Sequence, residues 1–245
     1  MKKIILLLCA TTLFVACSKS DNQASVLDVN SILPKKIIFT SNGAATTVDF
    51  TFNGKKIVKL NESDGTYTNY TYTNNLITKI EGFTSDNNSY GSTILEYNTL
   101  NQLISTVQIN VRNNSARIKN FVYNADNTIS YKATATENFK IYADKIERYY
   151  DNDPNSLYTR TFTFDTKNNP YKNIEGFDKI WFSMEEKTLN YVNNISSIKY
   201  TLSGSGQSGS ISDNIIQYNA NNFPTVETIT DYRGTVNETK KEYFY

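Results

Sequence analysis

The feature of this sequence that most restricts its fold is a recurring pattern of aromatic residues and asparagines. The segment YTYTNNLITKIEGF (70–83) is echoed by FTFDTKNNPYKNIEGF (162–177), and both place two aromatic residues before asparagines and Ile-Glu-Gly-Phe. Related segments recur at intervals of 19 to 27 residues. Such self-similarity is the signature of a repeat architecture. The aromatic anchors of the repeats are Phe52, Tyr72, Tyr97, Tyr123, Tyr142, Phe164, Tyr191 and Tyr218.

Each repeat has the composition of a β-hairpin. In TVDFTF (47–52), Val48, Phe50 and Phe52 alternate with polar residues, which is the period of a strand with one buried face. Asn53-Gly54 is a two-residue hairpin signal, and the chain has 32 asparagines, a residue that tolerates the positive φ of such turns. We predict an all-β fold, an antiparallel meander of about eight β-hairpin repeats. It forms one long, twisted and curled sheet, or folds into two layers.

The two halves of the chain follow the same plan. The offsets from Phe52, Tyr72, Tyr97 and Tyr123 to the corresponding later anchors are 90, 92, 94 and 95 residues. We therefore predict a β-hairpin repeat domain over 34–245, built by duplication from about 46–137 and 138–245. Tight turns are expected at one edge of the sheet. The other edge is expected to carry the looser segments 84–91, 152–156 and 203–210.

The N-terminus has the features of a secretory signal. Lys2 and Lys3 precede an apolar run that is too short to span a bilayer as a helix. The run ends in FVAC (14–17), which resembles a bacterial lipobox. The resemblance implies that residues 1–16 are a lipoprotein signal peptide and that Cys17 is lipidated. The alternatives are an ordinary signal peptide with an incidental cysteine and an uncleaved anchor. Residues 17–33 are then a lipidated N-terminus and flexible tether, and the protein is anchored in the outer membrane on its periplasmic or cell-surface face.

The hairpin units resemble the YD repeats of RHS-type proteins, with a Tyr-x-x-x-Asn/Gly-Leu/Ile rhythm. Over residues 46 to 245 the chain is also similar to uncharacterised Bacteroidota-type lipoproteins built from such units. The spacing of the units is uneven, and the strict Gly and Asp positions of YD repeats are missing. The resemblance implies a meander that curls over its aromatic face.

Composition excludes several kinds of chemistry. The sequence has no histidine, which removes histidine triads and imidazole metal sites. Of its two cysteines, Cys17 is the predicted lipidation site and Cys9 lies in the predicted signal, so no disulfide or thiol nucleophile is expected. The numbers of basic residues (Lys+Arg 25) and acidic residues (Asp+Glu 24) are nearly equal, so the protein has no strong net positive charge to attract nucleic acid. We expect no cofactor, no metal site, no catalytic residue and no nucleic-acid partner.

A few residues remain as candidates for function. Glu81 and Glu175 occupy equivalent repeat positions, so a carboxylate pair is conceivable, but solvated strand ends are the simpler interpretation. Asp151 and Asp153 could touch a cation, but a turn is the simpler interpretation. An aromatic platform for sugar stacking could form from Trp181, Tyr171 and Phe177, which core packing would also explain.

These observations favour a non-enzymatic envelope protein. We expect an outer-membrane-anchored lipoprotein that acts as a binding or assembly module, with a polysaccharide or another envelope protein as partner. The alternatives are a carboxylate-based carbohydrate-active enzyme and a passive structural envelope protein. Strands of six to eight residues are expected, which is shorter than the roughly 9–11 residues of a transmembrane β-strand.

Overall fold

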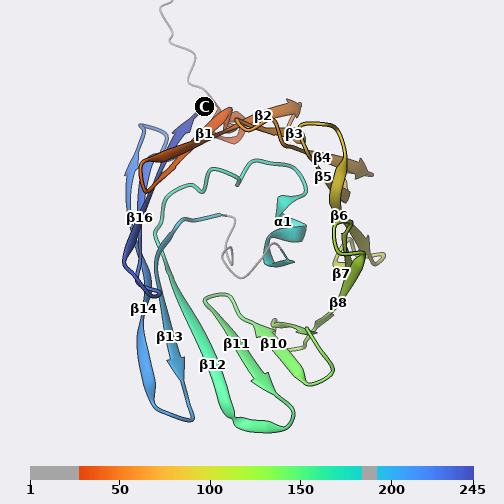
Figure 1. Cartoon of the computed structure of the whole chain (residues 1–245), viewed down its shortest axis with the longest axis vertical. Coiled ribbons are helices and arrows are strands. Elements are labelled where there is room, and N and C mark those ends of the chain that lie inside the picture. Colours follow the sequence, from red (N-terminus) through yellow and green to blue (C-terminus); the bar gives the residue numbers. More distant parts are fainter. Residues whose placement is uncertain (1–27, 184–191) are drawn as a thin grey trace, which may run out of the picture.

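The computed structural model describes residues 28–183 and 192–245, and side chains at 154 and 155 are not described. Within these ranges the chain forms a closed barrel of 16 antiparallel strands (Figure 1). Strands that follow one another in the sequence are neighbours in the wall. The first and last strands pair from Lys36↔Phe244 to Ser41↔Thr239 and so close the ring.

The strands vary from 4 to 12 residues in length. Their bounds are β1 (Lys36–Ser41), β2 (Ala44–Asn53), β3 (Lys56–Glu62), β4 (Tyr67–Thr73), β5 (Leu76–Phe83), β6 (Ser89–Tyr97), β7 (Leu103–Asn110), β8 (Ser115–Tyr123), β9 (Ile129–Lys132), β10 (Glu137–Ile141), β11 (Lys145–Tyr150), β12 (Asp153–Phe164), β13 (Ile195–Leu202), β14 (Gln207–Tyr218), β15 (Pro224–Asp231) and β16 (Asn237–Phe244). Three short helical segments complete the described elements: η1 (Val29–Ser31), α1 (Phe177–Ile180) and η2 (Trp181–Ser183).

The predicted antiparallel all-β meander is confirmed, but the predicted open or two-layered sheet is wrong because the sheet closes on itself. The physical reason lies in repeated irregularities of the strand pairing. A β-bulge bends its strand and increases the local twist. Bulges that recur at one end of several hairpins therefore add to the curl of the sheet, whose two edges meet at β1 and β16. The register shifts by one residue immediately before the anchors Phe52, Tyr72, Tyr97, Phe164 and Tyr218.

Six of the eight anchor aromatics line the interior, as the strand alternation predicted: Phe52, Tyr72, Tyr97, Tyr123, Phe164 and Tyr218. The Tyr97 hydroxyl donates to the Ile77 carbonyl at 2.7 Å, and the Tyr123 hydroxyl donates to the Leu103 carbonyl at 3.2 Å. Each ring thus packs inside, while its hydroxyl satisfies the backbone of the preceding hairpin. This row of anchor residues, the aromatic ladder, therefore stabilises the wall by linking successive hairpins.

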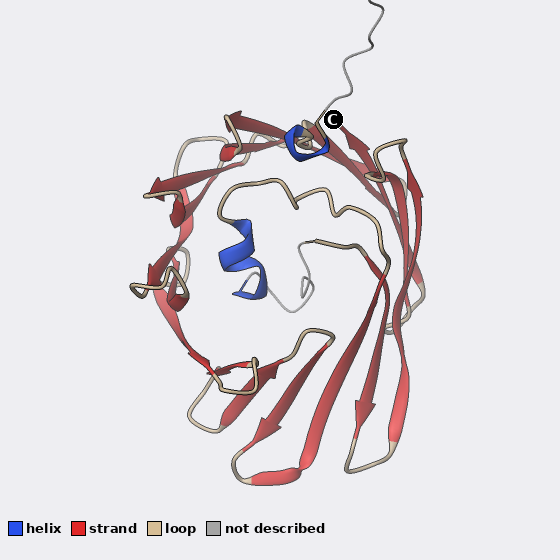
Figure 2. Ribbon diagram, turned by 180° about the vertical axis from the view of Figure 1, so that it is seen from behind, coloured by secondary structure: helices blue, strands red, loops and turns tan. Residues whose placement is uncertain are grey.

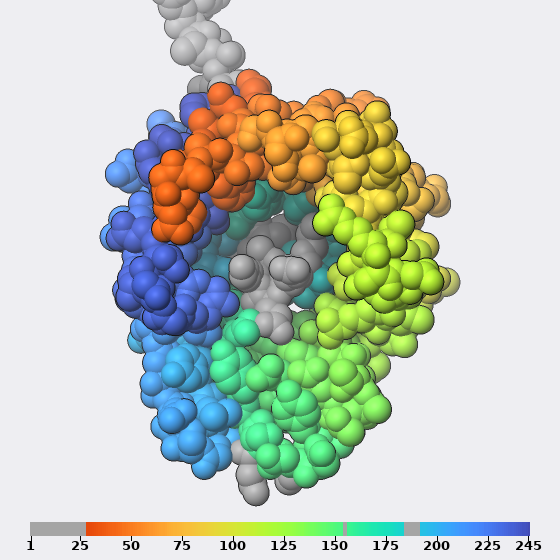
Figure 3. Space-filling view, viewed as in Figure 1, coloured from red at the N-terminus to blue at the C-terminus, as the bar shows by residue number. Residues whose placement is uncertain are grey.

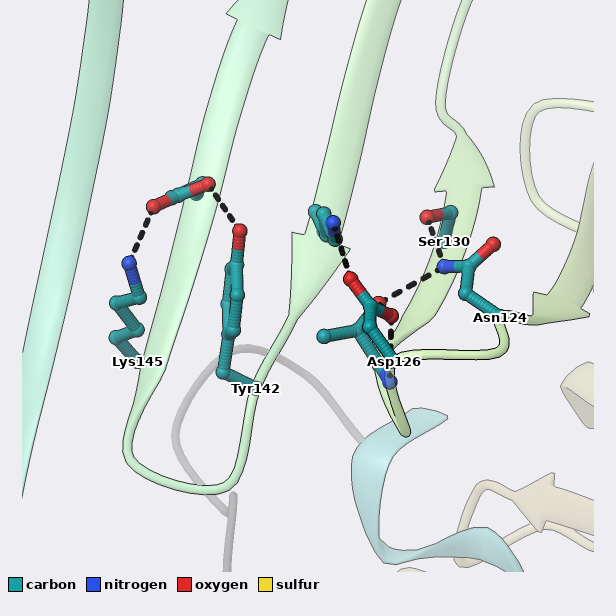
Figure 4. Close-up of polar contacts among 8 residues, drawn as sticks. Asn124, Asp126, Ser130, Tyr142 and Lys145 are labelled. Atoms are coloured by element: carbon teal, nitrogen blue, oxygen red, sulfur yellow. Dashed lines mark hydrogen bonds and ion pairs between the residues drawn. The ribbon is translucent and has the colours of Figure 1, made fainter.

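One anchor was assigned to the wrong face. Ile141 pairs with Ile146 on the inner side, so the next residue, Tyr142, lies on the outer side. Its hydroxyl donates to Glu147 at 2.7 Å, and Lys145 binds the same carboxylate at 2.6 Å (Figure 4). The anchor Tyr191 lies outside the described residues.

A long connection between β12 and β13 enters the barrel, where α1 and η2 lie inside the ring of strands (Figures 1 and 2). Phe177, Ile180 and Phe182 are buried there in one core cluster with the wall. The ring of Phe182 stands edge-on to Phe121, with centroids 5.0 Å apart. We call residues 165–183 and 192–194 the interior segment.

The two Ile-Glu-Gly-Phe motifs have different structures, so their predicted equivalence as strand ends is wrong. The first motif belongs to β5, where Gly82 pairs with Gly91 of β6. The second lies in the interior segment, where Gly176 precedes α1 with φ of 83°. A Cβ on Gly176 would also lie 3.2 Å from the Asn75 carbonyl oxygen, so this position needs glycine for both backbone conformation and space.

The interior segment is tied to the end of the barrel at which the described chain begins. Asn173 donates from Nδ2 to the carbonyls of Val29 and Ile32, at 2.8 and 2.9 Å. The Glu175 amide donates to the Lys55 carbonyl at 3.0 Å. Residues of the predicted tether therefore contact the interior segment directly.

The distribution of connections is partly as predicted. Tight turns with positive φ at Asn74 and Asn75 lie at one end. The loops 84–88, 151–152 and 203–206 lie at the other end and are shorter than expected, because the following strands begin earlier. The long connection between β12 and β13 nevertheless lies at the end expected to carry mostly tight turns.

The outer face of the wall is rich in charged side chains. Lys79 and Glu81 project outward from β5 and form an ion pair of 2.7 Å. On β16, Lys240 and Glu242 form another of 3.0 Å. The wall encloses the interior without a break in the space-filling view (Figure 3). None of the helices within 28–183 and 192–245 is both long and apolar enough to cross a bilayer.

Candidate functional site

A cavity lies inside the barrel between the interior segment and the wall strands β12 to β16. Its volume is about 330 Å³, within the range of about 300–1,000 Å³ that is usual for small-molecule sites. Asn169, Pro170 and Tyr171 of the interior segment form one side. The inward residues of the strands form the other, so the space lies where the interior segment packs beside this part of the wall.

Part of the cavity lining is apolar. Ile195 and Ile198 of β13 line it together with Ile211 of β14 and Ile229 of β15. Ile198 and Ile229 face inward through strand alternation, while Ile211 is the extra residue of a bulge between β13 and β14. This surface can accept the apolar face of a small molecule.

The polar part of the lining centres on Glu227, whose side chain points inward from β15. The residue is 7% exposed. Its carboxylate accepts from Asn214 Nδ2 at 2.9 Å, Lys241 Nζ at 2.9 Å and the Tyr243 hydroxyl at 2.6 Å. A buried carboxylate needs such donors to offset its lost hydration.

Tyr243 stays a neutral donor in this cluster. Burial raises the pKa of Tyr243 well above its ordinary value, and the negative charge of Glu227 raises it further. A protonated phenol can donate to the carboxylate at any physiological pH. The cluster therefore keeps one arrangement of donors and acceptors.

Asn214 has one unsatisfied atom. A carboxylate can only accept hydrogen bonds, so Glu227 fixes the amide with Nδ2 toward it and Oδ1 away. Asn214 Oδ1 is buried and has no hydrogen-bond partner within the part of the chain that the structure describes. An unmet buried acceptor costs about 1–3 kcal/mol, so this cavity-lining residue is suited to receive a donor from a bound molecule.

The other charged groups of the lining also have partners. Arg233 binds Asp231 through two parallel contacts, Nε to Oδ1 at 3.0 Å and Nη2 to Oδ2 at 2.5 Å. Arg160 of β12 donates from Nε to the Tyr158 hydroxyl at 3.2 Å. The ionic groups of the cavity are thus engaged within the protein.

A second hollow of about 530 Å³ lies against the inner face of β4 to β8. Thr93, Gln108 and Arg117 contribute to its lining. Arg117 is exposed, and the hollow opens more widely to solvent than the first. The less open cavity with its buried Glu227 cluster is therefore the better candidate site.

The predicted aromatic platform is only partly assembled. Tyr171 lines the cavity and stacks with Phe177 at a centroid distance of 5.9 Å. Trp181 instead packs against Phe182, 5.8 Å away with rings at 85°. The three rings do not form one exposed, coplanar row. Their role in binding stays a prediction, and Tyr171 is the member that reaches the cavity.

The structure does not bring the candidate carboxylates together. Glu81 lies on the outer face of β5, whereas Glu175 belongs to the interior segment. Asp151 accepts from Lys132 at 3.0 Å and Asn138 at 2.6 Å, next to the turn at 151–152. No cluster of three or more potential metal ligands occurs among the described residues. The predicted lipidation site, Cys17, lies outside them.

Comparison with known proteins gives a resemblance of shape alone. No family model matches the chain, and no curated protein matches it. Among solved structures, a porin-like protein from Bacteroides uniformis is similar, with 11% identity, a TM-score of 0.39, and coverage of 86% of this chain and 97% of that one. A porin-like protein from Bacteroides vulgatus has 7% identity, a TM-score of 0.39, and coverage of 87% and 98%. The description as porin-like belongs to those two proteins.

Sequence reasoning missed the polar cluster, although one signal was present. Counting back by twos from the anchor Tyr218 places Ile216, Asn214 and Ser212 on the inner face. Asn214 is thus a polar residue on the apolar face. The signal was obscured by Ile215, which is apolar yet points outward and is 71% exposed.

Proposed function

We propose that this protein is a binding module of the cell envelope, anchored in the outer membrane through lipidated Cys17, and that its barrel holds a small ligand. The observation that supports this proposal best is the cavity of about 330 Å³ between the interior segment and the wall. It combines an isoleucine surface with a few fixed polar groups, as small-molecule sites usually do.

The outer face of the barrel supports attachment by a lipid anchor. Lysines such as Lys79 and Lys240 point outward from the strands, and a lysine facing lipid at the bilayer midplane costs about 2–4 kcal/mol. β9 and β10 contain 4 and 5 residues, well below the roughly 9–11 needed to span, so this part of the wall is too short to cross a bilayer, although β2, β12 and β14 contain 10, 12 and 12. An outer face with charged side chains is suited to contact with water, so the lipid on Cys17 would supply the membrane attachment.

The alternative, a carboxylate-based carbohydrate-active enzyme, has weaker support. Its two carboxylates should lie about 5–10 Å apart in a cleft. Glu227 and Asp231 both face inward on β15, but four residues of strand separate them by about 13 Å. Lys241 and Arg233 bind them, which leaves neither poised as an acid or a nucleophile.

The binding function is tested by filling the cavity. Ile229→Trp places a large side chain inside, whereas Thr228→Trp places the same side chain on the outer face of the same strand. Each full-length protein is incubated with a small-molecule extract of the envelope and examined by native mass spectrometry. We expect a bound species with the wild type and Thr228→Trp that is lost with Ile229→Trp. Equal binding by both variants, or no bound species on the wild type, would refute the proposal.

The anchor is tested separately. Cys17→Ser removes the thiol that the lipid would modify. We expect the wild type in the outer-membrane fraction and the variant in the soluble envelope fraction, and protease treatment of intact cells then reports the exposed side. A variant that stays in the outer-membrane fraction would show that Cys17 is not the anchor.

A further inference from the structure

We infer that the cavity selects an uncharged, hydroxyl-bearing ligand of about monosaccharide size. This inference rests on the proposed function, because it assigns a ligand class to the same cavity. It depends on three features of the lining: its charges, its unused hydrogen-bonding groups and its apolar wall.

Two ion pairs within the protein engage four of the charged side chains of the lining. Glu227 is bound by Lys241 at 2.9 Å, and Asp231 is bound by Arg233 at 2.5 Å. The remaining cation of the lining, Arg160, donates to the Tyr158 hydroxyl. An ionic ligand would have to compete with these contacts and lose its hydration, so a charge on the ligand is a disadvantage here.

The hydrogen-bonding groups that remain are uncharged. Asn214 Oδ1 is an acceptor without a partner, and the Ser212 and Thr239 hydroxyls line the same cavity without a side-chain hydrogen bond in the described structure. Asn214, Ile229 and Thr239 occupy one cross-strand row, so Asn214 and Thr239 are about 10 Å apart. Ser212 is two residues from Asn214 along β14, or about 7 Å. Hydroxyls on a small ring can reach such groups together.

The apolar wall faces the same space. Ile198 and Ile229 come from β13 and β15, and the Tyr171 ring lies on the interior-segment side. A sugar ring presents C–H groups on one face and hydroxyls around its edge, which matches a lining that is apolar in one part and hydrogen-bonding in another. A purely apolar ligand would leave Asn214 Oδ1 unsatisfied.

The test compares ring-shaped probes that differ from glucose either in charge or in the number of hydroxyls. Glucose, glucuronate and glucosamine share a ring of hydroxyls, and cyclohexanol has the ring with a single hydroxyl. Binding to the full-length wild-type protein is measured by isothermal titration calorimetry. We expect glucose to bind at least tenfold more tightly than each of the other three. Equal or tighter binding of a charged probe or of cyclohexanol, or no binding of glucose, overturns the inference.

A pair of variants tests the role of Asn214. Asn214→Leu removes the unsatisfied acceptor, while Gln217→Leu makes a similar change on the outer face of the same strand. We expect glucose affinity to fall at least tenfold in Asn214→Leu and to stay unchanged in Gln217→Leu. Unchanged glucose affinity in a folded Asn214→Leu protein also overturns the inference. The probe comparison on the wild type does not depend on this variant folding.

The failure of this inference is distinguishable from failure of the proposed function. A charged or apolar compound whose binding is abolished by Ile229→Trp but not by Thr228→Trp would overturn the ligand class and leave the binding function in place. The absence of any compound with that dependence would overturn both.

Discussion

The Tyr97→Phe substitution would test whether the aromatic ladder stabilises the wall through its hydroxyls as well as its rings. The change keeps the ring and deletes the hydroxyl that donates to the Ile77 carbonyl at 2.7 Å. A typical protein hydrogen bond contributes about 0.5–1.5 kcal/mol, and a buried acceptor that loses its donor costs about 1–3 kcal/mol. We therefore expect the free energy of unfolding to fall by about 1–2 kcal/mol.

The matched control is Tyr67→Phe, which removes an exposed hydroxyl that donates to Asn87 at 2.9 Å. Because water replaces that contact, we expect a change below about 0.5 kcal/mol. Urea unfolding followed by tryptophan fluorescence measures both variants. In a thermal scan, the Tyr97 change corresponds to about 2–8 °C, at about 2–4 °C per kcal/mol for a chain of this size. Equal effects of the two variants would refute the view that the ladder hydroxyls matter.

Three further predictions concern pH and packing. Hydrogen bonds from Lys140 and then Thr128 lower the pKa of Asp126 from 3.8 to about 2 (Figure 4). The stabilisation by this carboxylate is therefore present above pH 3.8 and is lost as the pH falls toward 2. In an acid titration of unfolding, Asp126→Asn should lack this loss of stability. Gly91→Ala would bring a Cβ to 2.7 Å from the Ile109 carbonyl oxygen, so we expect a loss of about 1–3 kcal/mol in urea unfolding, whereas a neutral result would contradict the close packing. Burial raises the pKa of Tyr70, Tyr97, Tyr171 and Tyr245 above the ordinary value of 10.0. Above about pH 10 the unfolded chain therefore releases protons that the native state keeps, and the urea midpoint should fall as the pH rises. A constant midpoint would contradict the raised pKa values.

Much of the local structure could be predicted from the chain. The alternation around Phe50 and Phe52 defines an inner face, and Asn-Gly and Asn-Asn pairs mark turns because they tolerate positive φ. The candidate site could not be found in the same way. The Glu227 cluster joins residues of three strands, and only the register places Lys241 beside Glu227.

The sequence by itself determined the strands, the turns and the aromatic inner face of this protein, because alternation and turn chemistry act over a few residues. Only the tertiary structure decided three other features: closure of the sheet into a barrel, entry of residues 165–183 and 192–194 into the interior, and assembly of the cavity. Closure adds up the twist of 16 strands, and the bulges that increase this twist leave little trace in the sequence. The second Ile-Glu-Gly-Phe motif shows the same limit, since four identical residues form strand in one context, whereas in the other only the last of them, Phe177, begins α1.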